Sequence, residues 1–435
     1  MLDINLIRQK PDLVKKKVDQ KYFKEKRSHF VDQVLKLDQE RKKLLTKKEK
    51  LQADINKLSK TKPDRRTILI LRNKKKDKKK LNWQLREIED KFLELMYKIP
   101  NIVTSDVPVG RDENDNKVLR KWGKPTKFAF KPKEHWELGA ELDIIDIPRA
   151  AKVSGARFNY LKGDLAFLEF AIVQHSLKVL TDEKILAKII QSANLKVGAK
   201  PFIPVIPPIF IKPNYFQKMA RLDPPEDKYY IPKGDLYLIG SAEHTLGAMY
   251  ADETFEEAQM PVRYVGFSTC CRRESGSYGK DTKGILRVHQ FDKIEMESFD
   301  MPENSLEEHK FMIAIQEYLM QSLKIPYQVV IICTGDMGAP DARQNDIEAW
   351  LPGQNKYRET HTADYMTDYQ ARRLNIKVRR KNGKTEIVHM NDATAFAIGR
   401  TIIAILENYQ QKDGSVAIPK VLKPYMNGIK EIKPK

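Results

Sequence analysis

The sequence contains little cysteine and no long hydrophobic run. Only three of its 435 residues are cysteine, and two of these, Cys270 and Cys271, are adjacent. Three thiols cannot form a disulfide framework, and their spacing does not match a zinc site. No apolar run reaches the ~18 residues of a membrane span. The first residues carry charges where a signal peptide has its apolar stretch. We therefore expect a cytoplasmic protein with reduced thiols and no membrane partner.

Glycine-rich phosphate-binding motifs are also absent. The chain has no GxxxxGK[ST] motif and no GxGxxG following a strand-like run. These absences argue against a P-loop and against a dinucleotide-binding fold. If the protein uses ATP, arginines and metal ions must therefore hold the phosphates.

Positive charge is concentrated at one end of the chain. The formal net charge is +20, and residues 1–100 hold 31 Lys and Arg against 15 Asp and Glu, a net charge of +16. Such a concentration indicates a polyanionic partner, most simply a nucleic acid. An anionic membrane surface is the alternative.

The same basic region has the pattern of a helical hairpin. Apolar residues recur at steps of three and four from Phe30 to Leu58, and again from Leu81 to Leu95. Between them lies a helix breaker that contains Pro63. This heptad spacing predicts an antiparallel coiled-coil arm over about residues 30–97, on the order of 40 Å long. Residues 72–80 (RNKKKDKKK) lie near its end and suit a phosphate backbone.

The rest of the chain has a different pattern. Residues 101–132 are polar and rich in turn formers, which is typical of a linker. From about residue 133, strand-like runs alternate with helical ones. This alternation predicts an α+β domain around a largely antiparallel sheet.

One stretch, residues 262–296, has features suited to nucleotide binding. A strand-like run ends at Arg272, a glycine- and serine-rich loop follows, and a second run carries Arg287, His289 and Phe291. A guanidinium at the base of such a loop can hold a phosphate, while an aromatic ring stacks on a base. Basic hairpins are common, so this pattern alone leaves an ordinary structural role open.

This stretch resembles motif 2 of class II aminoacyl-tRNA synthetases, in the form found in seryl-tRNA synthetases of the bacterial type. Gly240–Glu243 is similar to that family's G-T-A-E segment, Pro207–Pro208 to the end of motif 1, and Ala397–Arg400 to the end of motif 3. The motif 2 matches are Cys270, Arg272, Glu274, Gly276, Ser277, Gly279, Asp281, Thr282, Gly284, Arg287, His289, Gln290, Phe291, Lys293 and Glu295.

The resemblance implies a fold and its boundaries. The fold would be α+β, with a class II synthetase catalytic domain on a largely antiparallel β-sheet with flanking helices. An N-terminal helical domain with a long antiparallel coiled-coil arm would precede it. We expect a tRNA-binding domain over residues 1–104, a linker over 105–132 and the catalytic domain over 133–435.

It also implies an activity: a ligase that activates L-serine with ATP and transfers it to the 3′-terminal adenosine of tRNA-Ser, with tRNA-Sec as a further candidate. The arm would bind the tRNA, Mg²⁺ would accompany ATP, and motif 1 would build a homodimer. Arg272 would hold the α-phosphate, Glu274 and Phe291 the adenine, and Arg400 the γ-phosphate. These four residues include the expected catalytic set of Arg272, Glu274 and Arg400.

The complete implied sites are larger. The ATP site would comprise Arg272, Arg273, Glu274, Arg287, Val288, Phe291, Glu359, Thr360, His361, Thr362 and Arg400, of which Glu359 and Thr362 would contact the metal. The serine site would comprise Ser241, Ala242, Glu243, Glu295, Asp392 and Thr394.

Three segments depart from the family pattern. Asn345 replaces a common tyrosine, residues 360–362 (THT) replace a segment rich in serine and apolar residues, and residues 390–394 (MNDAT) replace T-L-N-G-S/T. The last change puts the carboxylate of Asp392 where the family has an amide. Lineage drift explains such changes, and altered amino-acid preference is the alternative. Two other functions stay open: a ligase that aminoacylates a carrier protein, and a catalytically weakened RNA-binding homologue.

Overall fold

The structure, a computed structural model, describes residues 1–435 except 24, 61–62, 275–282 and 435. The motif 2 residues Gly276, Ser277, Gly279, Asp281 and Thr282 therefore lie outside the described residues. The chain divides into two compact units, residues 1–102 and residues 103–435.

The first unit is entirely helical. Two short helices, α1 (Ile4–Gln9) and α2 (Pro11–Asp19), precede two long ones, α3 (His29–Leu58) and α4 (Arg65–Lys98). The Asp3 side chain accepts a hydrogen bond from the Asn5 N–H, which caps α1. Pro11 starts α2, where its missing N–H is tolerated.

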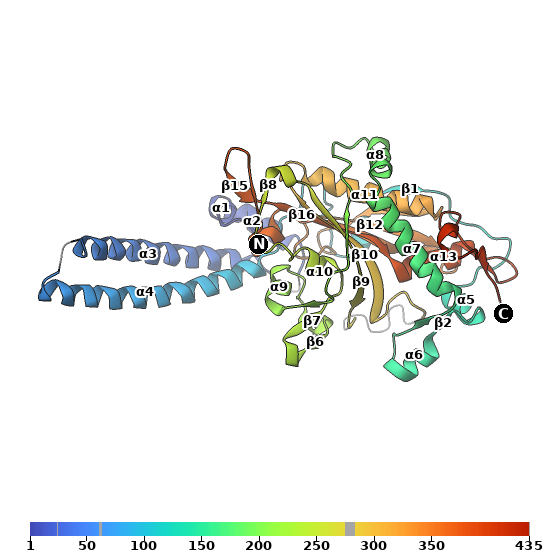
Figure 1. Cartoon of the computed structure of the whole chain (residues 1–435), viewed down its shortest axis with the longest axis horizontal. Coiled ribbons are helices and arrows are strands. Elements are labelled where there is room, and N and C mark those ends of the chain that lie inside the picture. Colours follow the sequence, from blue (N-terminus) through green and yellow to red (C-terminus); the bar gives the residue numbers. More distant parts are fainter. Residues whose placement is uncertain (24, 61–62, 275–282, 435) are drawn as a thin grey trace. The chain divides into compact units, whose positions relative to one another are not determined.

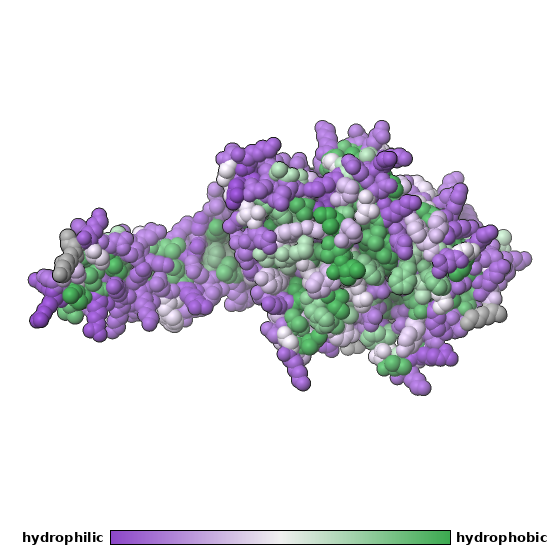
Figure 2. All heavy atoms as spheres, in the orientation of Figure 1, coloured by the Kyte–Doolittle hydropathy of each residue, from purple (hydrophilic) through white to green (hydrophobic). Residues whose placement is uncertain are grey.

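The two long helices lie side by side in opposite directions (Figure 1). Arg41 pairs with Glu89 at 3.3 Å near the base of this hairpin, and Lys74 pairs with Asp54 at 2.6 Å toward its end. The Asp64 side chain caps α4 by accepting from the Thr67 N–H. The sequence prediction of an antiparallel helical arm is thus confirmed. Figure 2 shows the arm as mostly hydrophilic.

An eight-stranded sheet forms the frame of the second unit. Every neighbouring pair is antiparallel except β4 and β9, which are parallel. A largely antiparallel sheet was predicted, and the structure confirms it. In spatial order the strands are β1 (Lys117–Trp122), β11 (Tyr327–Ile331), β12 (Arg343–Leu351), β13 (Lys356–Tyr365), β16 (His389–Ala397), β10 (Gln290–Asp300), β9 (Val262–Cys271) and β4 (Ile203–Val205).

Three helices pack on this sheet: α7 (Asp164–Thr181), α11 (Ser305–Ser322) and α13 (Ile398–Tyr409). The main hydrophobic core joins their apolar side chains to Ile294, Met296, Ala393 and Ala395 of the central strands. Because successive strand residues point to opposite faces, Lys293, Glu295, Asp392 and Thr394 point away from these helices. The core therefore sets the central strands so that their polar residues share the other face.

Smaller elements surround the sheet. The short strands are β2 (Ile145–Asp146), β3 (Tyr160–Leu161), β5 (Phe210–Ile211), β6 (Tyr230–Ile231), β7 (Leu236–Leu238), β8 (Thr254–Glu256), β14 (Lys377–Arg379), β15 (Thr385–Ile387), β17 (Val416–Ala417) and β18 (Glu431–Ile432). The short helices are α5 (His135–Glu141), α6 (Ile147–Ser154), α8 (Glu183–Ser192), α9 (Pro213–Lys218), α10 (Glu243–Leu246) and α12 (Tyr369–Leu374). Single 3-10 turns occur at Glu113–Asp115, Pro225–Asp227, Pro232–Gly234, Glu257–Gln259 and Lys423–Tyr425.

The segment expected as a linker contributes to the sheet. Within residues 105–132, β1 pairs with β11 from Lys117 opposite Ile331 to Trp122 opposite Tyr327. Trp122 stacks on Tyr327 with ring centroids 5.7 Å apart. Its polar composition is typical of an edge strand, which faces solvent on one side. In the part of the chain that the structure describes, no helix combines the length and apolarity needed to cross a membrane.

Candidate active site

A cavity of about 630 Å³, open to solvent, lies on the polar face of the sheet. It gathers side chains from β10, β13, β16 and the start of α13, together with the segment that follows β9. Nine of the eleven residues expected to bind ATP line it: Arg272, Glu274, Arg287, Val288, Phe291, Glu359, Thr360, Thr362 and Arg400. The structure thus brings together residues that are up to 128 positions apart in the sequence.

Arg272 and Phe291 lie side by side in the cavity. The Arg272 guanidinium carbon lies 5.3 Å from the centroid of the Phe291 ring. Its Nε donates to the Gly240 carbonyl at 3.1 Å, which orients the guanidinium in the cavity that it lines. A Cβ at Gly240 would lie 3.3 Å from that Nε, so the close approach favours glycine there. A phosphate site and an aromatic platform are therefore adjacent.

Two ion pairs border the same cavity. Arg287 pairs with Glu274 at 2.9 Å, and Arg400 pairs with Glu359 at 2.8 Å. Enclosure alone would raise the pKa of the Glu359 carboxyl, but Arg400 and Arg272 lower it. Arg400 is the third residue of α13, whose N-terminal dipole also favours an anion. Positive charge thus faces the cavity from two sides.

Two expected ATP residues do not line this cavity. Arg273 is exposed, and its backbone N–H donates to the Asp227 carbonyl at 3.0 Å. His361 points to the helix-covered face, where its ring lies 5.3 Å from that of Phe396. The alternation along β13 is the physical reason, because Thr360 and Thr362 point to the opposite side. For these two residues the side-chain positions differ from the sequence expectation.

The residues expected to bind serine meet beside this cavity. Thr394 lines the cavity, and so does Lys293, which forms an ion pair with Glu295. The Ser241 hydroxyl donates to Glu295 Oε2 at 3.0 Å and accepts from Lys293 Nζ at 3.2 Å. Ala242 is fully buried behind Ser241 and packs in the smaller core.

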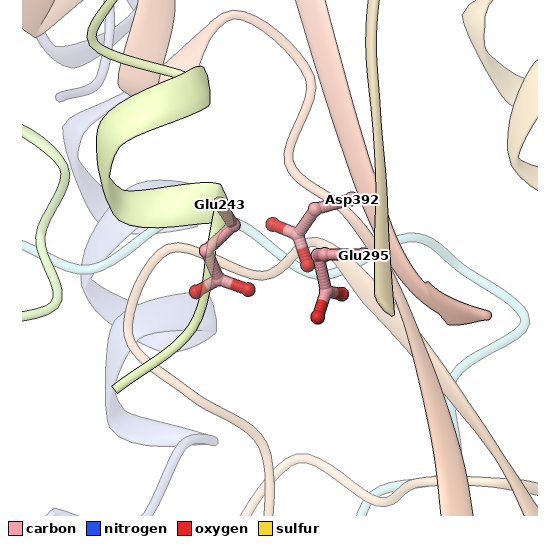
Figure 3. A group of neighbouring side chains, drawn as sticks. All are labelled: Glu243, Glu295 and Asp392. Carbon is pink, nitrogen blue, oxygen red and sulfur yellow. The ribbon is translucent and has the colours of Figure 1, made fainter. Parts of the chain in front are cut away.

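Three buried carboxylates converge at this point. Figure 3 shows Glu243, Glu295 and Asp392 pointing toward one another, from α10, β10 and β16. Carboxylate oxygens of the three lie within 4.8 Å of one another. Burial raises the pKa of Glu295 and raises that of Asp392 well above its usual range, with the charges of neighbouring carboxylates adding to the effect. The cluster is thus short of positive charge.

One cation that contacts this cluster, Arg221, lies outside all of the sequence motifs. Arg221 lies 2.8 Å from Glu243 and donates to Asp364 at 2.8 Å and to Asp392 at 3.3 Å. It comes from the segment after α9, which the motifs do not include. In the sequence, Arg221 is marked only by its position shortly before a turn-forming Asp-Pro-Pro.

The region also contains buried groups that the sequence pattern did not single out. His244 Nε2 lies 3.4 Å from Glu243, and burial lowers the pKa of this histidine to about 4. Asp346, on β12 opposite Thr362, has its pKa raised well above the usual range by burial and by the charge of Glu359. A single acidic residue in a predicted strand is too common a pattern to single out.

Known proteins resemble the whole chain. Residues 1–103 match the seryl-tRNA synthetase N-terminal domain family, and residues 229–409 match the tRNA synthetase class II core domain (G, H, P, S and T). The serine–tRNA ligase of Dictyoglomus thermophilum is 40% identical and is covered, like this chain, over 100% of its length. This chain belongs to the seryl-tRNA synthetase family.

Solved structures support the family assignment. A seryl-tRNA synthetase from Pyrococcus horikoshii, complexed with ATP, matches with a TM-score of 0.88 and 39% identity over 100% of both chains. A cytoplasmic serine–tRNA ligase from Naegleria fowleri, in complex with AMP, matches with a TM-score of 0.84 and 31% identity over 100% of this chain and 99% of that one. The sequence-based prediction of a class II synthetase, a ligase, is therefore confirmed.

Proposed function

We propose that this protein is a serine–tRNA ligase whose cavity binds ATP and whose carboxylate cluster binds serine. The observation that carries the proposal is the junction of the two sites at Lys293. This residue lines the cavity and forms an ion pair with Glu295 of the cluster. Serine bound at the cluster would therefore have its carboxylate next to the phosphates of ATP bound in the cavity.

The residue roles follow from the groups present. Arg272 takes the α-phosphate with its guanidinium group, and Phe291 stacks on the adenine, whose amino group donates to Glu274. Arg400, at the positive end of α13, takes the γ-phosphate. Arg287 and Val288 complete the nucleotide site. Arg273 contributes only general positive charge, because it lies outside the cavity.

Serine fits the cluster by charge and hydrogen bonding. Its ammonium interacts with Glu243, Glu295 and Asp392, while Thr394 and Ser241 surround its side chain. A site that pairs the serine hydroxyl rejects alanine by about 10⁴-fold, because alanine would leave buried polar groups unpaired. Threonine is excluded by its extra methyl group.

The reaction requires positioning rather than acid–base catalysis. The serine carboxylate attacks the α-phosphorus while pyrophosphate leaves, so negative charge develops on phosphate oxygens that Arg272 and Arg400 can stabilise. The terminal ribose hydroxyl of tRNA then attacks the carbonyl of seryl-adenylate and releases AMP. His289 is not among the residues that line the cavity, and its Nδ1 lies 3.0 Å from the Arg272 carbonyl oxygen. This position suits a structural role.

The donor set near Glu359 fits Mg²⁺, which prefers carboxylate and hydroxyl oxygens. Glu359 and Asp346 line a second cavity that adjoins the first one at Arg287 and Arg400. The carboxylates of Glu359 and Asp346 and the hydroxyl of Thr362 would hold the ion. When bound, Mg²⁺ would neutralise charge on the β- and γ-phosphates.

The helical arm is proposed to bind tRNA-Ser. Lys75, Lys76 and Lys79 of α4 are exposed, whereas Lys74 and Lys78 are engaged with Asp54 and Gln52 of α3. The exposed lysines can neutralise phosphates and release counterions.

A homodimer is proposed from an exposed apolar patch. Phe170 of α7 is 60% exposed and Ile206, just after β4, is 86% exposed, with Phe167 and Ile203 partly exposed beside them. Ile203 and Ile206 directly precede Pro207–Pro208, which resembles the end of motif 1, and motif 1 builds the interface in this family. We also place the protein in the cytoplasm, where aminoacylated tRNA is consumed.

Two assays test the proposed function. Serine-dependent exchange between ATP and pyrophosphate tests activation, and transfer of radiolabelled serine to tRNA tests the second step. Deleting residues 61–80 should abolish transfer and leave exchange intact. Exchange that requires a carrier protein would contradict the tRNA assignment. Exchange accompanied by transfer of serine to such a carrier, in place of tRNA, would contradict it as well.

A further inference from the structure

The central strands carry a row of carboxylates that needs a cation. Asp392 lies opposite Asp364 of β13 and opposite Glu297 of β10 in the register of the sheet. All three side chains are buried. Like charges directly opposite one another destabilise a sheet, so this row requires positive charge or protons. Glu243 and Glu295 add two further carboxylates above it.

Arg221 supplies that charge at the centre of the row. Its Nη2 donates to Asp364 Oδ2 at 2.8 Å and to Asp392 Oδ2 at 3.3 Å, and its Nε lies 2.8 Å from Glu243 Oε1. Its Nη1 lies 3.5 Å from Asp341 Oδ1. A planar, permanently charged guanidinium is suited to bridging several carboxylates in this way.

Two carboxylates near the substrate position, Asp392 and Glu295, each give one oxygen to a protein cation and keep another. Asp392 contacts Arg221 through Oδ2, while its Oδ1 has no partner among the described residues. Glu295 contacts Lys293 and Ser241 through Oε2, while its Oε1 likewise has no partner among them. Buried acceptors without partners are costly in a native structure. These oxygens are arranged for a ligand with a positive charge.

We propose that Arg221 is a positioning residue of the serine subsite: it orients Asp392 and Glu243 and supports their negative charge, so that their remaining oxygens bind the substrate ammonium. This inference rests on the proposed function and explains the aspartate at position 392. A carboxylate can stand there without disrupting the site because Arg221 compensates it.

The surrounding titratable groups are consistent with this role. Burial alone would raise the pKa of Glu243, but Arg221, His244 and Lys293 lower it well below its usual range. Burial and neighbouring carboxylates raise the pKa of Asp392, and Arg221 opposes the increase. The other charged groups that interact with Arg221 are Glu297, Asp341, Asp364 and Lys228.

The test is the pH dependence of the KM for serine in the exchange assay. Arg221→Met should raise this KM at least about 10-fold at pH 7. The increase should be smaller at pH 9, because the carboxyls of Asp392 and Glu243 lose their protons at the higher pH. The effect on kcat should be smaller. The matched control is Arg380→Met, which removes another arginine that bridges Glu303 and Glu386 away from the site. It should change the KM less than 2-fold at both pH values.

A double variant separates positioning from general stability. Asp392→Asn needs no compensating cation, so Arg221→Met should raise the KM much less in an Asp392→Asn background than in the wild type. Arg221→Lys, which keeps the charge without the fork, should be intermediate and serves if Arg221→Met does not fold. A KM increase that is independent of pH and identical in both backgrounds would overturn the proposal. Wild-type exchange with serine in that case would leave the proposed function intact.

Discussion

Replacement of Arg272 by lysine tests the nucleotide site most sharply, because Arg273 beside it is a matched control. Arg272 is held by a hydrogen bond from Nε to the Gly240 carbonyl and by contact with the Phe291 ring, and it lines the cavity. Arg273 is exposed and lies outside it. Arg272→Lys keeps one positive charge, but it loses the planar fork and the hydrogen bond that orients it.

The expected magnitude follows from the loss of one charge-assisted contact to the α-phosphate in the transition state. Such a contact is worth about 3 to 4 kcal/mol in an enclosed site, or on the order of 10² to 10³ in kcat. Arg273→Lys should change kcat and the KM for ATP less than about 3-fold, since surface charges contribute little. The assay is serine-dependent ATP–pyrophosphate exchange. Equal losses for the two variants would refute the assignment of Arg272 to the phosphate.

Three further predictions concern other parts of the molecule. Phe291→Ala should raise the KM for ATP about 5- to 100-fold in the exchange assay, because base stacking on a ring contributes about 1–3 kcal/mol; an unchanged KM would contradict the adenine assignment. Replacing Lys75, Lys76 and Lys79 by serine should weaken tRNA binding and flatten the dependence of log K on log salt by roughly one unit for each lost phosphate contact, and unchanged salt dependence in a filter-binding titration would exclude these contacts. Burial and the charge of Asp292 raise the pKa of Glu169 to about 8 from its ordinary 4.5. The folded protein therefore holds the Glu169 proton more tightly than the unfolded chain does. The free energy of unfolding consequently falls by at most about 5 kcal/mol as the pH rises from about 4.5 to about 8. Glu169→Gln should remove this loss, so that its melting temperature exceeds that of the wild type at pH 9 but not at pH 5; parallel curves would show that the group is not buried.

Much of the fold could be predicted because its signals are local. The heptad steps from Phe30 to Leu58 and from Leu81 to Leu95 predict two helices, and Pro63 predicts the turn between them. The residues that line the cavity could be singled out because most of them cluster in one motif, with Arg400 and Glu359 added by the resemblance to a known family. Their approach to one another follows from the order of β13, β16, β10 and β9 in the sheet.

The charge network around Arg221 could not be predicted in this way. Its partners come from α10, β13, β16 and the loop before β12, and a pattern within any one segment does not reveal them. Asp364 and Asp392 lie opposite each other only through strand register, which sequence alone does not specify. The sequence predicts a linker in the segment that contains strand β1, because an exposed edge strand has the composition of a loop. His361 lies outside the cavity because alternation along β13 turns its side chain to the opposite face of the sheet from Thr360 and Thr362.

The most direct test of the central claim is amino-acid-dependent ATP–pyrophosphate exchange by the purified full-length protein with Mg²⁺, across the twenty standard amino acids. The account predicts strong exchange with serine and at least about 10³-fold less with alanine and glycine, which lack the hydroxyl. No exchange with serine, or a maximum with alanine or glycine, would contradict it.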